Sequence, residues 1–376
     1  MTASTSPSPP NSVDAPHLPF DIVAEILSRL PVQHLLQLRC VCKSWNSLIS
    51  LDFKFAKNQL SFSTSNKDCH RLFLSFTRSS CEFLLCHSPI SSFFTSASIV
   101  IEKQPVTLLL NNQHSPMEIS TCDGILCFEI DESLAVLYNP STRKFKMLPP
   151  LKTPKQTCFP KIYTLGYDHI TSNYKIIATV TLSDRKRKTQ VNIHTLGTDY
   201  WTRIQDIPCS SLHVKQGIFV NDTVNWLVDD TSSSRGMVIV SLDLEKESYQ
   251  KLSIPLYDYG LQFSTSLGAL RGCLSMLAHG IEFASVWIMK EYGNDTSWTK
   301  LFSFPHTEDG RFYYYQKVLY ISEDDQLLME FCSMGEYGLV VYDSITNTFT
   351  TPKMQNNIHD LRLIPYAYVE SLISPF

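Results

Sequence analysis

Two cysteines lie two residues apart in the segment 39-RCVCKSWNSLIS-50, and closely spaced thiols can bind zinc or exchange disulfides. A metal or redox site is therefore one interpretation of Cys40 and Cys42. The same segment is apolar at helical spacing, with Trp45 one turn after Val41. On a helix, residues two apart point about 200° away from each other, so the two thiols would not readily share an ion. The pattern favours a packed helix in which Cys42 takes a small apolar position.

The other reactive residues do not form the pattern of a known catalytic or metal site. The eleven cysteines contain no C-x-x-C pair, and the eleven histidines are dispersed. The chain also lacks a G-x-S-x-G elbow, a Walker loop, a G-x-G-x-x-G loop and an H-E-x-x-H helix. We therefore expect reduced thiols in a cytoplasmic or nuclear protein, with no catalytic residue, no cofactor and no metal.

Composition and charge describe a folded protein rich in β-forming residues. The chain has 376 residues, 43% hydrophobic and 18% charged, with seventeen Tyr and twenty-one Phe. A net charge of -4 argues against a nucleic-acid partner. The longest uncharged run, residues 83–101, carries Ser, His and Pro, which predicts two short strands rather than a membrane span. Residues 1–16 lack an apolar signal segment and are expected to form a disordered leader.

Residues 18–50 have the apolar spacing of helices. One series lies between Pro19 and Pro31, where proline can begin or stop a helix. A second series runs on from Leu35 and is expected to break near residues 37–39 into two helices. A unit of about 40 residues is too small to bury all of these side chains by itself. We therefore expect a partner to cover part of its apolar surface.

After residue 58 the helical pattern gives way to short apolar runs separated by turns. Units of strand, turn, strand and proline recur, as in 136-VLYNPSTRKFKMLPP-150. The prolines Pro149, Pro208, Pro255, Pro305 and Pro352 lie 59, 47, 50 and 47 residues apart, and a degenerate earlier unit ends at Pro89. A period near 50 residues built from short strands predicts propeller blades. Six units favour six blades over five or seven, and residues 361–372 are a candidate strand that closes the ring on the first unit.

The segment 18-LPFDIVAEILSRLPVQHLLQLRCVCKSWNSLI-49 closely resembles the F-box. That resemblance implies a helical hook that binds a Skp-type adaptor, which links it to the cullin and RING subunits of a ubiquitin ligase. The residues expected to make or support this contact are Leu18, Pro19, Ile22, Ile26, Leu27, Leu30, Pro31, Leu35, Leu36, Arg39, Val41, Cys42, Lys43, Trp45, Leu48 and Ile49. A helical hairpin packed only on its own chain is the alternative.

The later repeats resemble the F-box-associated domain of the large plant F-box families, often described as F-box/kelch-repeat proteins. The resemblance lies in GILCFE at 124–129, LYNPSTRKFKMLPP at 137–150, LGYD at 165–168 and YKII at 174–177. No two of the thirteen glycines are adjacent, so the paired glycines of a strict kelch blade are absent from the sequence. A propeller of diverged blades is therefore expected.

Together these features predict an α+β multidomain chain, with a leader over residues 1–16, an F-box over 17–57 and an all-β propeller over 58–376. The resemblance implies a non-catalytic substrate-recognition subunit of a Skp–cullin–F-box ligase, which holds an unidentified substrate protein on propeller loops. Neither a nucleic acid nor a membrane is expected as a partner. A ligase-independent scaffold remains one alternative, and a propeller that acts as a small-ligand receptor or enzyme is another.

Two clusters of charged or aromatic residues have both a structural and a functional interpretation, and a third has a structural one. The basic run Arg185–Lys188 could be an import signal or a contact for an acidic partner, but a solvated hairpin tip is favoured. The residues Tyr313, Tyr314 and Tyr315 could form a recognition surface or pack between blades. Residues 323–325 are expected to form an acidic turn between two strands.

If residues 39–50 form a packed helix, substitutions at Trp45 and at Cys40 should have different effects on folding and adaptor binding. Trp45→Ala should unfold the hook or release the adaptor, because it removes the largest apolar side chain of this segment. Cys40→Ser should do little. Co-purification of the adaptor with each variant measures the difference. Loss of the adaptor in Cys40→Ser with retention in Trp45→Ala would show that this interpretation is wrong.

Overall fold

The computed structural model describes most of the chain after the leader. The described residues are 18–77, 83–95, 99–104, 118–131, 134–152, 161–182, 188–208, 214–230, 236–255, 265–308, 311–312, 314–333, 336–354 and 363–376. The expected disordered leader, residues 1–16, lies outside them. None of the described helices is long and apolar enough to cross a membrane.

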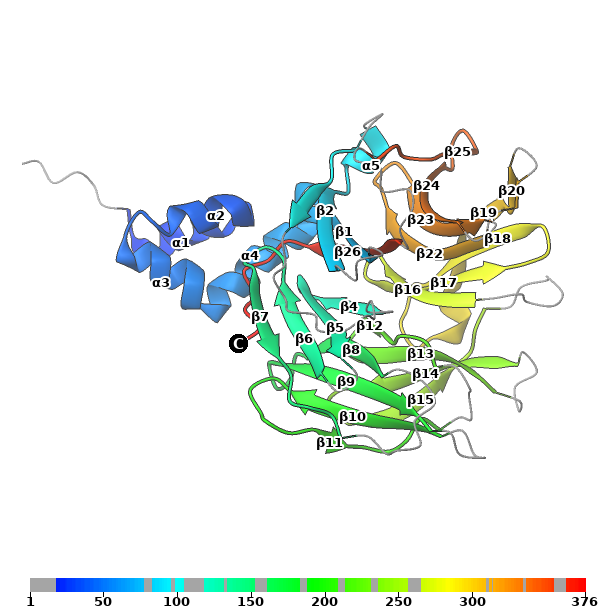
Figure 1. The fold of residues 1–376 in the computed structure, drawn as a ribbon, viewed down its shortest axis with the longest axis horizontal. Helices are drawn as coiled ribbons and strands as arrows, with labels where there is room; N and C mark the ends of the chain where they lie inside the picture. The colour runs from blue at the N-terminus through cyan, green and yellow to red at the C-terminus, as the bar shows by residue number, and fades with distance from the viewer. Residues whose placement is uncertain are drawn as a thin grey trace, which may run out of the picture.

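The N-terminal part is helical, as predicted, and projects from one end of a β-structure (Figure 1). Its helices are α1 (Phe20–Ser28), α2 (Val32–Leu38), α3 (Lys43–Leu51) and α4 (Phe53–Ser65). Pro19 directly precedes α1 and Pro31 directly precedes α2, where a missing backbone N–H costs nothing. Residues 18–53 are called the hook below. The boundary expected between residues 57 and 58 falls inside α4, and the division into domains stays a prediction.

Six four-stranded antiparallel sheets follow, which confirms the six-bladed propeller. In blade order the strands are β1 (His70–Thr77), β2 (Phe83–Pro89), β3 (Glu102–Gln104); β4 (Ile119–Cys122), β5 (Ile125–Asp131), β6 (Leu134–Asn139), β7 (Lys144–Met147); β8 (Ile162–Asp168), β9 (Asn173–Thr181), β10 (Thr189–Thr195), β11 (Thr202–Arg203); β12 (Ile218–Val220), β13 (Thr223–Asp229), β14 (Met237–Asp243), β15 (Ser248–Leu252); β16 (Thr265–Leu270), β17 (Cys273–His279), β18 (Phe283–Met289), β19 (Trp298–Pro305); and β22 (Tyr314–Ile321), β23 (Gln326–Ser333), β24 (Glu336–Asp343), β25 (Thr348–Thr350). The first blade is completed by β26 (Leu363–Val369). Smaller elements are η1 (Lys67–Cys69), α5 (Ser92–Thr95), η2 (Asp295–Ser297) and the hairpin of β20 (Thr307–Glu308) and β21 (Arg311–Phe312).

The innermost strand of each blade lies at the centre of the ring; this is the first strand of the blade along the chain, except in the first blade, where it is β26. Strands β26, β4, β8, β12, β16 and β22 each contact the next one in this order, and β22 contacts β26. The circle is therefore closed by β26, which pairs with β1 from His70↔Val369 to Phe76↔Leu363. This confirms the closing strand expected over residues 361–372. Closure removes the two open sheet edges that a linear array of blades would leave.

The motifs that resemble the F-box-associated domain meet at the segment that follows β26. Gly124 has φ 79°, and a Cβ at this position would lie 2.4 Å from the carbonyl oxygen of Val369. The buried amide of Asn139 donates to the carbonyl oxygens of Ser371 at 3.0 Å and Ile373 at 2.7 Å. These two residues therefore hold residues 370–376, here called the tail, against the second blade.

The oxygen of the same Asn139 side chain also shapes a turn. Its Oδ1 accepts from the backbone N–H groups of Ser141 at 2.8 Å and Thr142 at 3.1 Å. The sixth blade repeats this turn at Asp343, whose Oδ1 accepts from Ile345 and Thr346. The N–H groups of Thr346 and Ile345 hold the pKa of Asp343 below its ordinary value.

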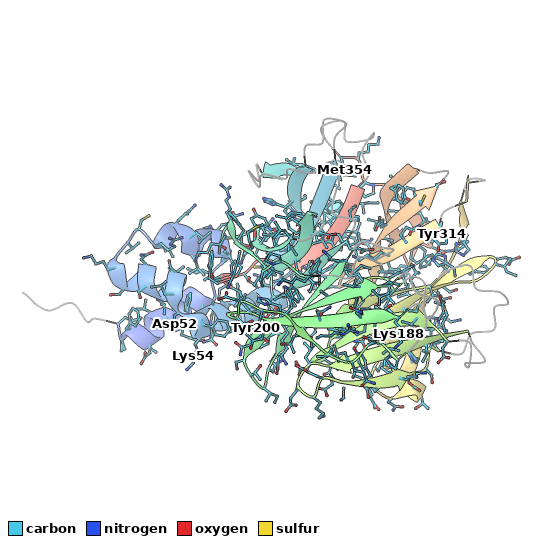
Figure 2. The ribbon with its side chains drawn as sticks, turned by 60° about the horizontal axis from the view of Figure 1, so that its bottom comes forward. Asp52, Lys54, Lys188, Tyr200, Tyr314 and Met354 are labelled. Atoms are coloured by element: carbon cyan, nitrogen blue, oxygen red, sulfur yellow. The ribbon has the colours of Figure 1, made fainter. Side chains whose placement is uncertain are left out.

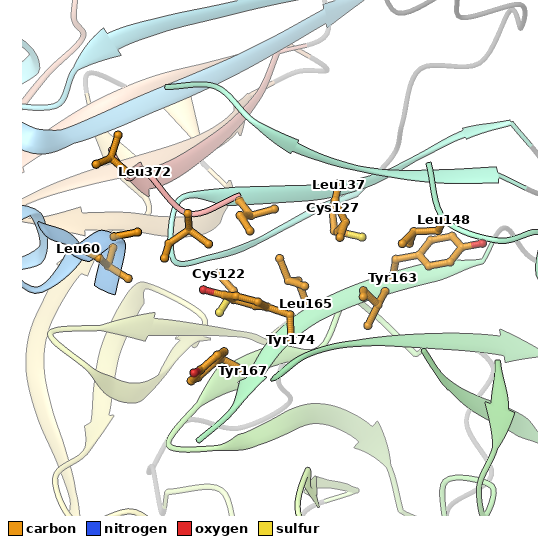
Figure 3. Close-up of a cluster of buried hydrophobic side chains, with 14 of the residues drawn as sticks. Leu60, Cys122, Cys127, Leu137, Leu148, Tyr163, Leu165, Tyr167, Tyr174 and Leu372 are labelled. Carbon is orange, nitrogen blue, oxygen red and sulfur yellow. The ribbon is translucent and has the colours of Figure 1, made fainter. Parts of the chain in front are cut away.

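One apolar cluster continues from the helices into the propeller. Figure 3 shows Leu60 of α4 close to Leu372 of the tail, with Cys122 and Tyr174 beside them. The same cluster includes Leu35 of α2, which is fully buried. The helices therefore share their core with the second and third blades.

The double role of Asn139 predicts its contribution to stability. Asn139→Ala leaves two buried carbonyl groups without their donor and removes a turn, so we expect it to lower the free energy of unfolding by about 2–4 kcal/mol. Asp343→Ala removes the matching turn from a blade that does not hold the tail, and a smaller loss is expected. Urea unfolding followed by tryptophan fluorescence measures both. Equal losses would contradict a tail-anchoring role for Asn139.

Candidate functional site

Exposed apolar side chains gather on the hook. Seven of the seventeen exposed large hydrophobic residues in the described part of the chain lie within residues 18–53, about a tenth of its length. They are Leu18, Phe20, Ile22, Ile26, Val41, Leu51 and Phe53, with exposed fractions from 46% to 81%. Such a concentration marks an interaction surface rather than the scattered apolar residues of an ordinary surface.

The two sides of α1 explain how the hook folds and still leaves this surface open. Ile22 and Ile26 are one turn apart and are 49% and 53% exposed. Leu27 is 3% exposed and belongs to the shared core, and Val23 packs against that core. The apolar residues of α1 therefore form two stripes, of which only one has a partner within the described chain.

The sixteen residues expected to bind an adaptor fall into three groups in the structure. Four are buried and hold the helices together: Leu27, Leu35, Leu48 and Ile49. Four are half-buried: Leu30, Pro31, Leu36 and Trp45. Eight are exposed and available to a partner: Leu18, Pro19, Ile22, Ile26, Arg39, Val41, Cys42 and Lys43.

Sequence reasoning missed three exposed apolar residues of the hook: Phe20, Leu51 and Phe53. Leu51 is 81% exposed and follows the buried Leu48 by three positions, at the end of α3. The F-box resemblance ended at Ile49, so Leu51 and Phe53 fell outside it. The signal that could have found them is the apolar pattern, which continues past that motif.

The two cysteines lie in the turn between α2 and α3, and both are exposed. The expectation that Cys42 packs on a helix is wrong, because α3 begins at Lys43 and the Cys42 backbone is extended, with φ -157° and ψ 165°. Trp45 does pack against the shared core, as expected. Among the described residues, no cluster of three or more His, Cys, Asp or Glu side chains is placed to hold a metal.

An ion pair joins α4 to the propeller. The Nζ atom of Lys57 lies 2.6 Å from Asp123 Oδ2 and 3.1 Å from the hydroxyl of Tyr174, which donates to the same carboxylate oxygen at 2.7 Å. Lys57 also lies 3.4 Å from the ring centroid of Tyr167. About a quarter of each charged side chain is exposed, so the contact is partly shielded from water. These bonds fix α4 on the second and third blades.

The tyrosines of residues 313–315 separate into packing and surface positions. Tyr315 is 1% exposed and donates to the carbonyl oxygen of Pro305 at 3.2 Å, so it packs between blades. Tyr314 is half-buried and stacks on His279, with centroids 4.7 Å apart. Tyr313 lies outside the described residues. Figure 2 places Tyr314 at the end of the molecule away from the hook.

The structure also shows where the described residues of the two charged clusters lie. Lys188 is exposed on the side of the propeller away from the hook, whereas residues 185–187 lie outside the described part (Figure 2). Glu323 and Asp324 are exposed in the turn between β22 and β23, as expected. Asp325 of the same turn pairs with Arg271 at 2.6 Å.

The stacked imidazole near Tyr314 predicts a pH dependence of stability. Burial, followed by the nearby His306, lowers the pKa of His279 to about 4. An unfolded histidine titrates near its ordinary pKa of about 6.5. Between these values the unfolded chain binds a proton that the folded chain does not, so this residue makes stability fall as the pH falls from about 6.5 to about 4.

His279→Phe keeps a ring in the stack and removes the titrating group. We expect a shallower decline of the melting temperature over this pH window than in the wild type. His34→Gln, at an exposed position, serves as the control and should not change the slope. A decline in His279→Phe as steep as in the wild type would contradict this assignment.

Comparison with known proteins gives two domain matches and several relatives. The family described as the F-box associated beta propeller domain matches residues 50–375, and the F-box domain matches residues 16–57. An F-box/kelch-repeat protein of Arabidopsis thaliana is 31% identical over 371 residues, covering 96% of this chain and 97% of the relative. The F-box protein CPR1 of the same species is 24% identical, covering 90% and 85%.

A solved structure supports the architecture alone. Hydrazine synthase of Kuenenia stuttgartiensis matches with a TM-score of 0.50 at 11% sequence identity, over 84% of this chain and 49% of that chain. At this identity the likeness concerns the fold and does not extend to activity.

Proposed function

The chain belongs to the F-box proteins that carry an F-box-associated β-propeller domain, and on this basis we propose that it is the substrate-recognition subunit of a Skp–cullin–F-box ubiquitin ligase. The observation that carries the proposal is the exposed apolar stripe of α1, centred on Ile22 and Ile26. A Skp-type adaptor would cover this stripe and would connect the chain to the cullin and RING subunits. Removal of these side chains from water would supply much of the binding free energy.

The hook residues would have two different roles in docking. The exposed residues of α1, of the turn before α3 and of the start of α3, including Val41 and Lys43, would contact the adaptor directly. The buried Leu35 and Leu48 would instead keep the helices in their arrangement. Substitution of the first group should affect binding alone, whereas substitution of the second should also affect folding.

The substrate protein would bind on the propeller side that faces away from the hook. On that side the hairpin of β17 and β18 presents Ile281 in its turn, 65% exposed, and Phe283 at the start of β18, 39% exposed. Figure 1 shows this hairpin at the opposite end of the molecule from α1 to α3. Apolar and aromatic side chains on a loop surface are typical anchors for a protein partner.

Ubiquitin transfer would take place on other subunits of the complex. This chain would contribute proximity, by holding substrate lysines near the conjugating enzyme and so raising their effective concentration. The shared core and the Lys57–Asp123 pair support this role, because they fix the helices on the propeller, whose far side would hold the substrate.

The proposal predicts that the exposed stripe of α1 is needed for docking and not for folding. Ile22→Ser/Ile26→Ser should weaken adaptor binding about a hundredfold or more, since two isoleucines would no longer be buried at the interface. The melting temperature should stay near that of the wild type. Ile281→Ser/Phe283→Ser is the matched control on the far side and should bind the adaptor normally.

Co-purification from cells tests the assembly itself. Recovery of the adaptor and a cullin with the wild type, but not with Ile22→Ser/Ile26→Ser, would support the ligase role. A target protein that accumulates when the chain is depleted would support it further. Recovery of the adaptor without any cullin would instead indicate a scaffold, and turnover of a small molecule by the chain would indicate a propeller enzyme.

A further inference from the structure

Two grooves meet at the corner between α3 and α4. The first has a volume of about 420 Å³ and runs between α1 and α3, with Phe20, Leu48 and Leu51 in its walls. The second has a volume of about 330 Å³ and lies between the hook and the propeller, where Leu51 and Phe53 face Leu196, Leu372 and Phe376. Leu51 and Asp52 line both grooves, so the two grooves are neighbours at this corner.

Three large apolar side chains are exposed around this corner. Leu51 is 81% exposed, Phe53 is 46% exposed and Phe376 is 71% exposed. The rest of the tail is not loosely attached, because residues 370–373 are buried and Asn139 holds two of its carbonyl groups. The aromatic ring of Phe376 is thus carried to the edge of the second groove by a well-anchored segment.

The second groove has fixed walls. Asp52 accepts from the backbone N–H of Phe55 at 2.8 Å, which sets the direction in which α4 leaves the corner. Lys57, one turn further along α4, is held by Asp123 and Tyr174 on the propeller side. The hook and the propeller therefore present this groove as a preformed surface.

We propose that the adaptor bound to α1 and α3 extends across the corner and places apolar side chains in the second groove, so that the propeller tail is part of the adaptor interface. This inference rests on the proposed function, and the shared wall of the two grooves carries it: Leu51 lines both, so a partner that covers Leu51 in the first groove also borders the second. Ser172, Asn173 and Ser374 in its walls offer hydroxyl and amide groups to the backbone of such a segment.

A contact of this kind would have a consequence for the complex. The adaptor would touch the hook and the propeller together, and would bind one relative orientation of the two. Substrate and adaptor would then stand in a defined geometry on opposite sides of the propeller.

The test uses full-length chain and purified Skp-type adaptor, with the dissociation constant measured by calorimetry. Two variants alter the second groove from the propeller side only: Phe376→Ser removes an apolar wall, and Asn173→Arg adds bulk and charge. Each should weaken adaptor binding about tenfold, because Phe376→Ser removes one buried apolar contact and Asn173→Arg obstructs the groove. Ile345→Ser is the matched control, because Ile345 is exposed like Phe376 (81% against 71%) but lies on a turn of the sixth blade that does not line the groove.

The outcomes separate this inference from the proposed function. Tenfold weakening in both groove variants, with unchanged melting temperatures and a normal Ile345→Ser control, would support it. Wild-type affinity in both groove variants, while Ile22→Ser/Ile26→Ser abolishes binding, would overturn it and leave the proposed function in place. Absence of adaptor binding by the wild type would overturn both.

Discussion

The pairing of β26 with β1 is the constraint on which the rest of the molecule depends. It joins residues 363–369 to residues 70–76 and turns a row of blades into a ring. The tail that follows β26 is pinned by Asn139 and by the ion pair of Glu370 with Arg71 at 3.0 Å. Helix α4 packs against this closed end, so the position of the hook also depends on closure.

The hook has more apolar residues than a helical unit of its size can bury by itself. Part of its apolar surface enters a core shared with the second and third blades, as Leu35 and Leu60 do. Another part, including Ile22 and Leu51, stays in water. The first part makes the hook continuous with the propeller, and the second part is the surface that the proposed adaptor would cover.

Much of the fold could be predicted from the sequence because its signals are local. Helical spacing marked α1 to α3, and recurring strand–turn–proline units gave six blades. The site was predicted less completely. The list of sixteen residues mixed buried positions such as Leu48 with exposed ones such as Ile26, since a motif match does not reveal which side of a helix is covered. Cys42 was misplaced because one residue decided whether it belonged to α3 or to the turn before it.

The sequence by itself determined the elements, their repeat and the family, because periods of two, of 3.6 and of about fifty residues are properties of neighbouring residues. Only the tertiary structure decided which of these elements contact one another. Lys57 meets Asp123 across 66 positions, and Asn139 meets Ser371 across 232 positions. Contacts so distant in the chain follow from how the ring closes, and no local pattern records them. For the same physical reason, the grooves at the α3–α4 corner exist only once the hook and the tail have been brought together.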